Sequence, residues 1–287
     1  LVKNTLHRTT FDRTSLTFNA TGSVALTGLA AGAPGHAMLE SWLQSAPPAS
    51  LVESWKGYIA AIRAAWLEHQ VLAFPDQRLS DDDLERFTQA FGGFGEDPFI
   101  APIPGRQHII AVERRADETS SLFAETWHTD WSFQPRPPAG TVLYGKLIPP
   151  VGGDTLFANQ HAALDAMPDG LRQRLEGRIA LHSAKKAYAP DGMYGERDKK
   201  GRSMVIKPSK DAERVQRHPL IRRHPETGRA GLFGCFGYII GIDDMDDAEA
   251  MPLLFELYQW QSRPEFQYRH RWQPDMLVMW DNRSVLH

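Results

Sequence analysis

Short apolar segments separated by turn-forming residues are the feature that most constrains the fold of this chain. Several have the apolar or alternating character of β-strands, and they span residues 71–74, 141–148, 155–158, 179–183, 266–272 and 276–280. Turns rich in glycine and proline, such as the one from Pro149 to Gly153, separate these segments. Many short strands with few helices favour an antiparallel sandwich or barrel over a doubly wound parallel sheet.

Four stretches of the chain show helical patterns. Ile59, Ile62 and Trp66 recur at helical spacing, and Ser80 with Asp83 has the pattern of a capping box at the start of a helix. We expect helices within residues 58–67, 80–91, 160–175 and 248–261. The predicted fold class is therefore mainly β with flanking helices.

Three expectations concern how the strands pack. Residues 266–272 and 276–280 bracket Gln273-Pro274-Asp275, which predicts a β-hairpin. This hairpin and residues 141–158 should belong to one barrel. The residues expected to point into the barrel are Leu143, Leu147, Leu277 and Met279. Residues 185–217 are charged and show no clear period, so we expect a mobile loop or flap outside the core.

The composition excludes several classes of protein. The 287 residues carry a net charge of −3, which gives no reason to expect nucleic acid or an anionic membrane as a partner. No apolar run approaches the ~18 residues of a membrane-spanning helix, and the first residues do not resemble a signal peptide. The single cysteine, Cys235, excludes an internal disulfide and suits a reducing compartment. We therefore expect a cytoplasmic protein that binds neither nucleic acid nor membranes.

The clearest chemical signal is the segment from Trp127 to Trp131. Residues i and i+2 of an extended strand point to the same side, so His128 and Asp130 can offer an imidazole and a carboxylate to one ion. This spacing alone is weak evidence, because 11 histidines and 35 acidic residues give about one such triplet by chance and the chain contains two. A strand histidine that is hydrogen-bonded to a neighbouring carboxylate is the structural alternative.

A metal site at this segment needs a third ligand from elsewhere in the chain. Two histidines and one carboxylate on one face of an iron ion leave three positions open, which is the arrangement of non-haem Fe(II) oxygenases. The histidines that could complete it are His161, His182, His218, His270 and His287. The residues alone leave this choice open.

Several motifs in a fixed order give the chain a specific resemblance. They are Trp127-His128-Thr129-Asp130, Pro137-Pro138-Ala139-Gly140, Gly152-Gly153-Asp154-Thr155, His224-Pro225-Glu226-Thr227-Gly228 and Trp280-Asp281-Asn282-Arg283 followed by His287. In this order they resemble the TauD/TfdA family, the taurine dioxygenase-like Fe(II)/2-oxoglutarate dioxygenases. The resemblance extends from about Tyr58 to the end. It divides the chain into a poorly matched N-terminal segment, 1–57, that packs on the barrel, and a dioxygenase domain, 58–287.

The resemblance implies a fold, two cofactors and a set of site residues. The implied fold is a double-stranded β-helix, a jelly-roll or cupin-like barrel. By the same resemblance Fe(II) is held by His128, Asp130 and His287, and Thr155 hydrogen-bonds the distal carboxylate of the cosubstrate 2-oxoglutarate. The implied activity is that of an oxygenase that uses O2 to oxidise a small organic substrate and releases succinate and CO2.

The chain departs from the family pattern at the cosubstrate. The family anchors the distal carboxylate with an arginine roughly ten to fifteen residues after the last histidine, because a bidentate charged pair fixes a carboxylate well. This sequence ends at His287. The residues from Leu6 to Phe11 resemble the family's missing C-terminal strand, so a rearranged chain would supply Arg8 for this role. A solvated N-terminal arginine is the alternative interpretation of Arg8.

A second departure concerns the substrate. The positions where taurine dioxygenase holds a sulfonate correspond to Asp97, Ile100 and Ala124, and none of these residues can repeat that role. A buried sulfonate without donors loses its charge-assisted hydrogen bonds, and a nearby acid repels it. Taurine is therefore not the expected substrate, and an acid with an apolar or aryl body fits Ile100 and Ala124 better.

Two other classes of function use the same residues. The absent arginine favours a catalytically silent, metal-binding cupin-like protein, and a metal-dependent hydrolase could use the same ligands with zinc. Oxygen-dependent formation of succinate distinguishes the oxygenase from both. The sequence leaves open the substrate, the reaction outcome and whether the chain forms a homo-oligomer.

Overall fold

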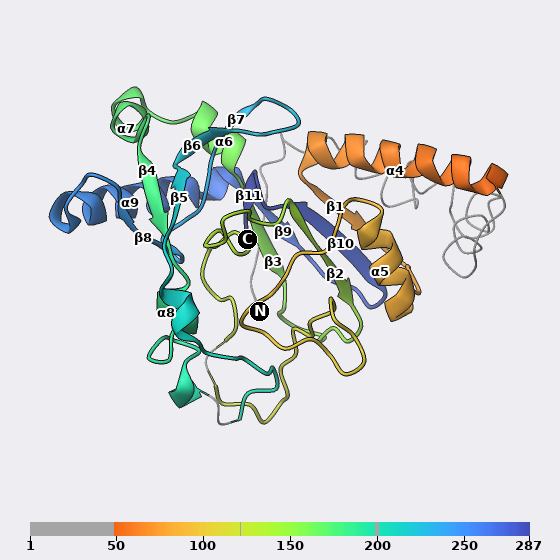
Figure 1. Ribbon diagram of the computed structural model, residues 1–287. Helices are drawn as coiled ribbons and strands as arrows, with labels where there is room; N and C mark the ends of the chain where they lie inside the picture. Colours follow the sequence, from red (N-terminus) through yellow and green to blue (C-terminus); the bar gives the residue numbers. More distant parts are fainter. Residues whose placement is uncertain (1–48, 121, 199–200) are drawn as a thin grey trace.

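The computed structural model describes residues 49–120, 122–198 and 201–287, whose helices and strands are shown in Figure 1. The strands are β1 (Val71–Phe74), β2 (Gly140–Gly145), β3 (Thr155–Asn159), β4 (Ile179–His182), β5 (Gln216–Pro219), β6 (Ile221–Arg223), β7 (Ala230–Leu232), β8 (Ile239–Ile242), β9 (Gln267–His270), β10 (Met276–Asp281) and β11 (Val285–Leu286). The α-helices are α4 (Ala49–His69), α5 (Asp81–Gln89), α6 (Gln160–Asp165), α7 (Asp169–Leu175), α8 (Lys185–Tyr188) and α9 (Asp247–Gln261). Within these residues no helix combines the length and the apolar character needed to cross a bilayer.

Two three-stranded sheets form the part of the fold that positions the site, with strand orders β1-β10-β2 and β11-β3-β9. β10 lies between β1 and β2, where Leu277 pairs with Phe74 on one side and with Tyr144 on the other. All residues of β10 are buried, as expected for a central strand. Each strand pair in the described residues is antiparallel, which confirms the mainly antiparallel architecture predicted from the sequence.

Two helices cover the sheet that contains β10. Ile62 and Trp66 of α4 and Phe87 of α5 pack against apolar side chains of β1 and β10. α5 begins at the predicted capping box, in which the hydroxyl of Ser80 accepts from the amide of Asp83 and the carboxylate of Asp83 accepts from the amide of Ser80. α4 begins at Ala49, earlier than the expected residue 58.

The packing of Trp66 explains why residue 140 is a glycine. A Cβ built on Gly140, at the start of β2, would lie 2.4 Å from Cζ2 of Trp66 and 2.7 Å from the carbonyl oxygen of Trp280. Only glycine allows this close approach of helix α4 to the edge of the sheet. The packing fixes the start of β2, the strand that follows the segment containing His128 and Asp130.

A second apolar core lies beside the β5-β4-β8 sheet and the β6-β7 pair. On α9, Leu253, Leu254 and Leu257 pack into this core together with residues of β7, β8, α6 and α7. The helices predicted within residues 160–175 and 248–261 are therefore present, and they close this side of the molecule (Figure 1).

The predicted hairpin of residues 266–272 and 276–280 is wrong. β9 pairs with β3, whereas β10 pairs with β1 and β2, so the connection through Asp275 crosses from one sheet to the other. Asp275 has a φ of 58°, and its amide donates to the carbonyl of Gly145 at 2.8 Å. Alternating residues and a turn indicate two strands, but they do not specify which strand pairs with which.

Of the four residues predicted to point into the barrel, Leu143 does so. It is partly buried beside the apolar cluster of Val278 and Trp280, which also contains Phe157 of β3. The prediction is wrong for Leu277 and Met279, which are buried on the other face of β10, against α4 and α5, because successive residues of a strand point to opposite sides. Leu147 is 93% exposed, because β2 ends at Gly145 and the alternation of sides does not continue beyond the strand.

The expectation that residues 185–217 lie outside the core is also wrong. Tyr188, Tyr194 and Met204 from this stretch are buried and pack with Phe99 and Phe133 in one apolar cluster. Most of the stretch is irregular, so its buried side chains follow neither the helical nor the strand period. Aromatic residues without a period gave no signal that could have revealed this burial.

Replacing a core leucine and an exposed leucine should separate burial from residue type. Leu277→Ala removes a side chain that is 2% exposed and should lower the free energy of unfolding by about 2–5 kcal/mol. Leu147→Ala, at 93% exposure, should change it by less than about 0.5 kcal/mol. Urea unfolding followed by tryptophan fluorescence measures both. Equal losses from the two variants would contradict the strand register.

Candidate metal centre and active site

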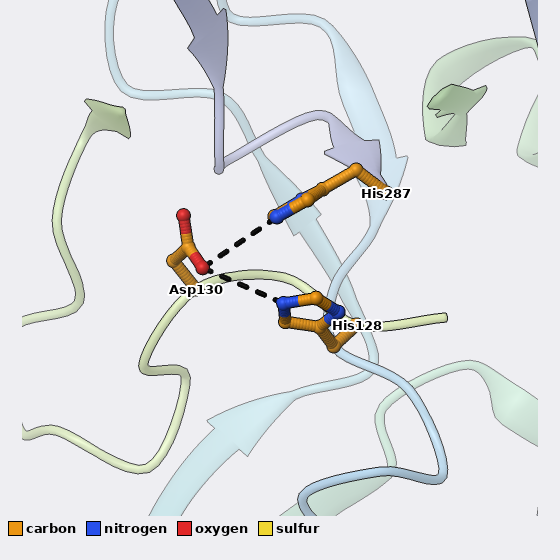
Figure 2. Close-up of side chains that lie close together, drawn as sticks. All are labelled: His128, Asp130 and His287. Atoms are coloured by element: carbon orange, nitrogen blue, oxygen red, sulfur yellow. Dashed lines mark ion pairs between the residues drawn. The ribbon is translucent and has the colours of Figure 1, made fainter. Parts of the chain in front are cut away.

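Three side chains from two distant parts of the chain meet at one point. His128 and Asp130 precede β2, and His287 follows β11. The Nε2 atoms of both histidines lie 3.6 Å from Oδ1 of Asp130. Figure 2 shows both rings facing this carboxylate. One ligand atom from each residue lies within 4.8 Å of the other two, and the described part of the chain holds no second group of this kind.

The backbone joins His128 to His287. The amide of His128 donates to the carbonyl of His287 at 2.9 Å, and the amide of His287 donates to the carbonyl of His128 at 2.8 Å. This reciprocal pair is the pattern of an antiparallel ladder, although residues 127–129 belong to no strand. The regular strand expected at this motif is therefore wrong. The side chains of His128 and Asp130 still face one another. The chain turns directly after them, at Trp131, which has a φ of 46°.

Hydrogen bonds orient the two imidazole rings. Nδ1 of His128 donates to the carbonyl of Thr126 at 2.9 Å, so the unprotonated nitrogen of this ring is Nε2, which faces Asp130. Burial and the neighbouring His128 lower the pKa of His287 to about 3, despite the nearby Asp130. The ring of His287 is therefore neutral and can offer a nitrogen lone pair to a metal ion.

A chain of hydrogen bonds fixes the carboxylate of Asp130. Its Oδ2 accepts from the hydroxyl of Thr141, whose oxygen accepts from the side-chain amide of Asn282 at 2.9 Å. The indole of Trp280 in turn donates to Oδ1 of Asn282 at 3.0 Å. Burial raises the pKa of Asp130, but the two histidines and Thr141 lower it more, so it lies below its ordinary value and the group is ionised.

Sequence reasoning did not single out Thr141 and Asn282. Thr141 follows the Pro137–Gly140 motif, and Asn282 lies inside the Trp280–Arg283 motif. The motifs were recognised, but the hydrogen bonds of these two residues to the metal centre were not predicted. The β2–β10 register places Thr141 opposite Trp280. Since this contact depends on pairing between distant strands, no local pattern could have revealed it.

The arrangement suits a divalent metal ion. Two ligand atoms that each bind one ion at about 2.1 Å, at right angles, lie about 3 Å apart. The observed 3.6 Å is close to this spacing and too long for a direct hydrogen bond. Nδ1 of His287 is buried without a hydrogen-bond partner among the described residues, so this ring owes its orientation to the backbone pair and to packing.

The other histidines considered as a third ligand lie elsewhere. Nδ1 of His161 lies 2.6 Å from the carbonyl oxygen of Ala230. His182 packs against His218 with ring centroids 5.1 Å apart, and His270 packs against an indole ring. Of the five candidates, only His287 lies with His128 and Asp130.

The second His-x-acid triplet, at His224, stabilises a loop. Nε2 of His224 donates to Asp281 at 3.0 Å, and Nδ1 accepts from the amides of Glu226 and Thr227 at 3.2 Å. The guanidinium of Arg283 donates to both Asp281 and Glu226. This network, in which His224 and Asp281 are buried, holds residues 281–283, which lead into β11 and His287.

A cavity of about 1670 Å³ includes the three clustered side chains in its lining. Thr155 also lines it, and its hydroxyl oxygen accepts from the indole of Trp272 at 2.8 Å. The hydroxyl proton of Thr155 is therefore free to donate to a ligand. Arg8, the other residue expected to hold the cosubstrate, lies outside the described residues.

Of the three positions that correspond to the sulfonate site of taurine dioxygenase, two are apolar and one, Asp97, is an acid. Ile100 and Ala124 line the cavity. Oδ1 of Asp97 accepts from the amides of Phe99 and Ile100 at 2.8 and 2.9 Å, while its Oδ2 is buried without a partner among the described residues. Burial raises the pKa of Asp97 to about 6.

A sequence model described as "Taurine catabolism dioxygenase TauD, TfdA family" matches residues 47–287. The chain belongs to the TauD/TfdA family. An alkylsulfatase from Acinetobacter baylyi is 34% identical over 230 residues, which cover 79% of this chain and 69% of that protein. An alpha-ketoglutarate-dependent 2,4-dichlorophenoxyacetate dioxygenase from Cupriavidus pinatubonensis is 34% identical over 238 residues, which cover 77% and 78%.

Solved structures of this family agree with the observed fold. A taurine dioxygenase from Burkholderia xenovorans has a TM-score of 0.64 at 27% identity and covers 85% of this chain and 76% of its own. AAD-2 in complex with Mn(II) and N-oxalylglycine has a TM-score of 0.61 at 25% identity and covers 85% and 82%. The predicted jelly-roll fold is thereby confirmed. The division of the chain at residues 57 and 58 stays a prediction.

The family determines the reaction class. This TauD/TfdA protein is an Fe(II)- and 2-oxoglutarate-dependent dioxygenase that acts on a small organic molecule with O2 and releases succinate and CO2. Its relatives do not favour the two alternatives, a silent metal-binding protein and a hydrolase.

Asp97 should make stability depend on pH. Its folded pKa of about 6 exceeds the ordinary value of 3.8, so the folded state binds this proton more tightly, and the resulting stabilisation is lost as pH rises from about 4 through 6. Asp97→Asn removes the titration, so its Tm relative to wild type should increase between pH 4 and pH 7.5. Scanning calorimetry at four pH values measures this difference. The exposed Asp191→Asn is the matched control and should show no trend, and a flat profile for Asp97→Asn would contradict the burial argument.

Proposed function

We propose that His128, Asp130 and His287 hold the Fe(II) of this dioxygenase. The observation that carries the proposal is the approach of both Nε2 atoms to one carboxylate oxygen, each at 3.6 Å. A set of two histidines and one carboxylate leaves one face of the ion open. Thr141 fixes the carboxylate, and the carbonyl of Thr126 fixes the ring of His128. Partners of this kind typically change metal affinity or activity by about 10–100-fold.

The bound iron, with 2-oxoglutarate and O2, supplies the oxidising chemistry, and the chain supplies binding, orientation and exclusion of water. In this proposal Thr155 donates its hydroxyl proton to the distal carboxylate of 2-oxoglutarate. Its free proton and its place in the same cavity as His287 support this role. Arg8 supplies the positive charge at that carboxylate, which the resemblance of Leu6–Phe11 to the family's C-terminal strand supports.

The proposed substrate is a small organic acid with an apolar or aryl body. Relatives named for phenoxypropionate, 2,4-dichlorophenoxyacetate and sulfate esters support this class. In this chain Ile100 and Ala124 offer apolar contacts, and the rings of Tyr188 and Tyr238 also line the cavity. Taurine has no such body and would meet no sulfonate donor at Asp97, Ile100 or Ala124, so we expect no turnover of it.

The proposal places the enzyme in the cytoplasm. Its net charge of −3 and its single, buried cysteine support a reducing compartment and a small-molecule partner rather than nucleic acid or a membrane. Association into a homo-oligomer is part of the same proposal.

Succinate release tests the metal site. With Fe(II), 2-oxoglutarate, O2 and either phenoxyacetate or hexyl sulfate, the protein should release succinate in step with substrate oxidation. His128→Ala, Asp130→Asn and His287→Ala should each lower the rate at least about 100-fold, because each removes or weakens one of three ligands. Chromatography measures succinate, and plasma emission measures the iron that stays bound.

His218→Gln is the matched control. Nε2 of His218 donates to the carbonyl of Gln134 at 3.0 Å, and a glutamine amide can keep this bond away from the metal centre. This variant should keep its iron and its succinate release. Full activity in all three ligand variants would overturn the metal site. Stoichiometric sulfite release from taurine would overturn the substrate class.

The cosubstrate residues should affect 2-oxoglutarate alone. Thr155→Val and Arg8→Gln should each raise the KM for 2-oxoglutarate at least about tenfold, because each removes a charge-assisted hydrogen bond. Arg13→Gln lowers the charge equally in the same N-terminal part of the chain and should leave this KM unchanged. Initial rates over a range of 2-oxoglutarate concentrations measure all three. Equal KM values for Arg8→Gln and Arg13→Gln would exclude Arg8 from the site.

A further inference from the structure

The lysine and arginine side chains that line the cavity differ in whether they pair with a carboxylate. Four of them pair with carboxylates, in the pairs Lys146–Asp81, Arg114–Glu118, Arg115–Asp117 and Arg202–Asp198. Lys186 also lines the cavity, and among the described residues it faces no carboxylate. Its charge is therefore available to a ligand.

Backbone carbonyls hold the ammonium group of Lys186. Nζ donates to the carbonyl of Phe236 at 3.3 Å and to that of Ile239 at 3.1 Å, and it lies 4.2 Å from the centre of the Phe236 ring. An ammonium has three N–H donors, so one donor remains. Burial lowers the pKa of Lys186, as expected for a cation without a counter-ion.

The turn that holds Lys186 also contacts the metal centre. In residues 235–239 the amides of Tyr238 and Ile239 both donate to the carbonyl of Cys235. A Cβ built on Gly237, in the middle of this turn, would lie 3.9 Å from Cβ of His128. The ring of Tyr238 lies 6.3 Å from that of His128. A single turn therefore lies between Lys186 and His128, and both residues line the same cavity.

We propose that Lys186 binds the acid group of the substrate, a carboxylate or a sulfate monoester, while the body of the substrate lies along the rings of Phe236 and Tyr238. The inference rests on the proposed function, because it identifies the residue that holds the acid group assigned there to the substrate. One free donor and one unbalanced positive charge match a singly charged group. Lys186 is thus a positioning residue that selects acids over neutral molecules of the same shape.

The test compares Lys186→Met with wild type. Methionine keeps an unbranched side chain and removes the charge and the donors. Lys185→Met is the matched control, since Lys185 is exposed like Lys186 and precedes it on α8, but does not line the cavity. The probes are phenoxyacetate, its uncharged amide and hexyl sulfate. Succinate release gives KM and kcat, calorimetry gives the Kd of phenoxyacetate, and thermal unfolding shows that each variant is folded.

Lys186→Met should raise the KM for phenoxyacetate or hexyl sulfate at least about tenfold, with a smaller effect on kcat. The KM for the amide should not change, and Lys186→Arg should recover most of the affinity for the acids. Lys185→Met should behave as wild type. If only one of the two acids shows the effect, that acid identifies the group that Lys186 binds.

Unchanged KM and Kd values for both acids in Lys186→Met would overturn the proposal. Equal losses for the acid and the amide would also overturn it, because they indicate a structural role. If wild type releases no succinate with any probe, the proposed substrate class fails, and the calorimetry still decides on Lys186. Binding of phenoxyacetate that Lys186→Met weakens tenfold supports the inference, and binding that is equal in both proteins or absent from wild type contradicts it.

Discussion

Two reciprocal backbone hydrogen bonds between His128 and His287 are the constraint on which the candidate metal centre depends. They join the segment before β2 to the end of β11, although neither segment is part of a longer ladder at that point. Because β10 runs through the sheet core and leads to β11, the packing of that core positions His287. The chemistry of the site therefore depends on the central strand as much as on the ligands.

Two sets of hydrogen bonds around the end of β10 support the ligands. Asn282 donates to Thr141, which in turn donates to Asp130. Asp281 accepts from His224 and from Arg283. Removing one partner would leave a buried charge uncompensated, so such a network costs little only while it is complete. A complete network holds a ligand set ready for metal without reorganisation.

Another part of the cavity wall is held together differently. Tyr188, Tyr194 and Met204 come from a largely irregular stretch, and they pack with Phe99 in an aromatic cluster. The metal side is held by hydrogen bonds with fixed geometry, whereas this side is held by apolar packing that tolerates changes of shape. This difference agrees with a family whose members are named for substrates as different as alkyl sulfates and aryloxy acids.

The metal motif shows how far the chain could be interpreted before its fold was known. His128 and Asp130 were found from their spacing, although the strand assumed for them is absent. His287 could not be chosen from five histidines by spacing, and only the ordered motifs of the family distinguished it. The contact of Lys186 with the turn at Phe236 could not be predicted from any local pattern, because it joins a short helix to a segment about fifty residues away.

The sequence by itself determined what depends on near neighbours. Strands β1, β2, β3, β4, β9 and β10, the helices of residues 160–175 and 248–261 and the cap at Ser80 follow from interactions over a few residues. Only the tertiary structure decided the partners of β9 and β10, the exposure of Leu147 and the burial of Tyr188. Pairing and burial depend on which distant segments meet, and a period along the chain shows which face of an element is apolar but not what covers it.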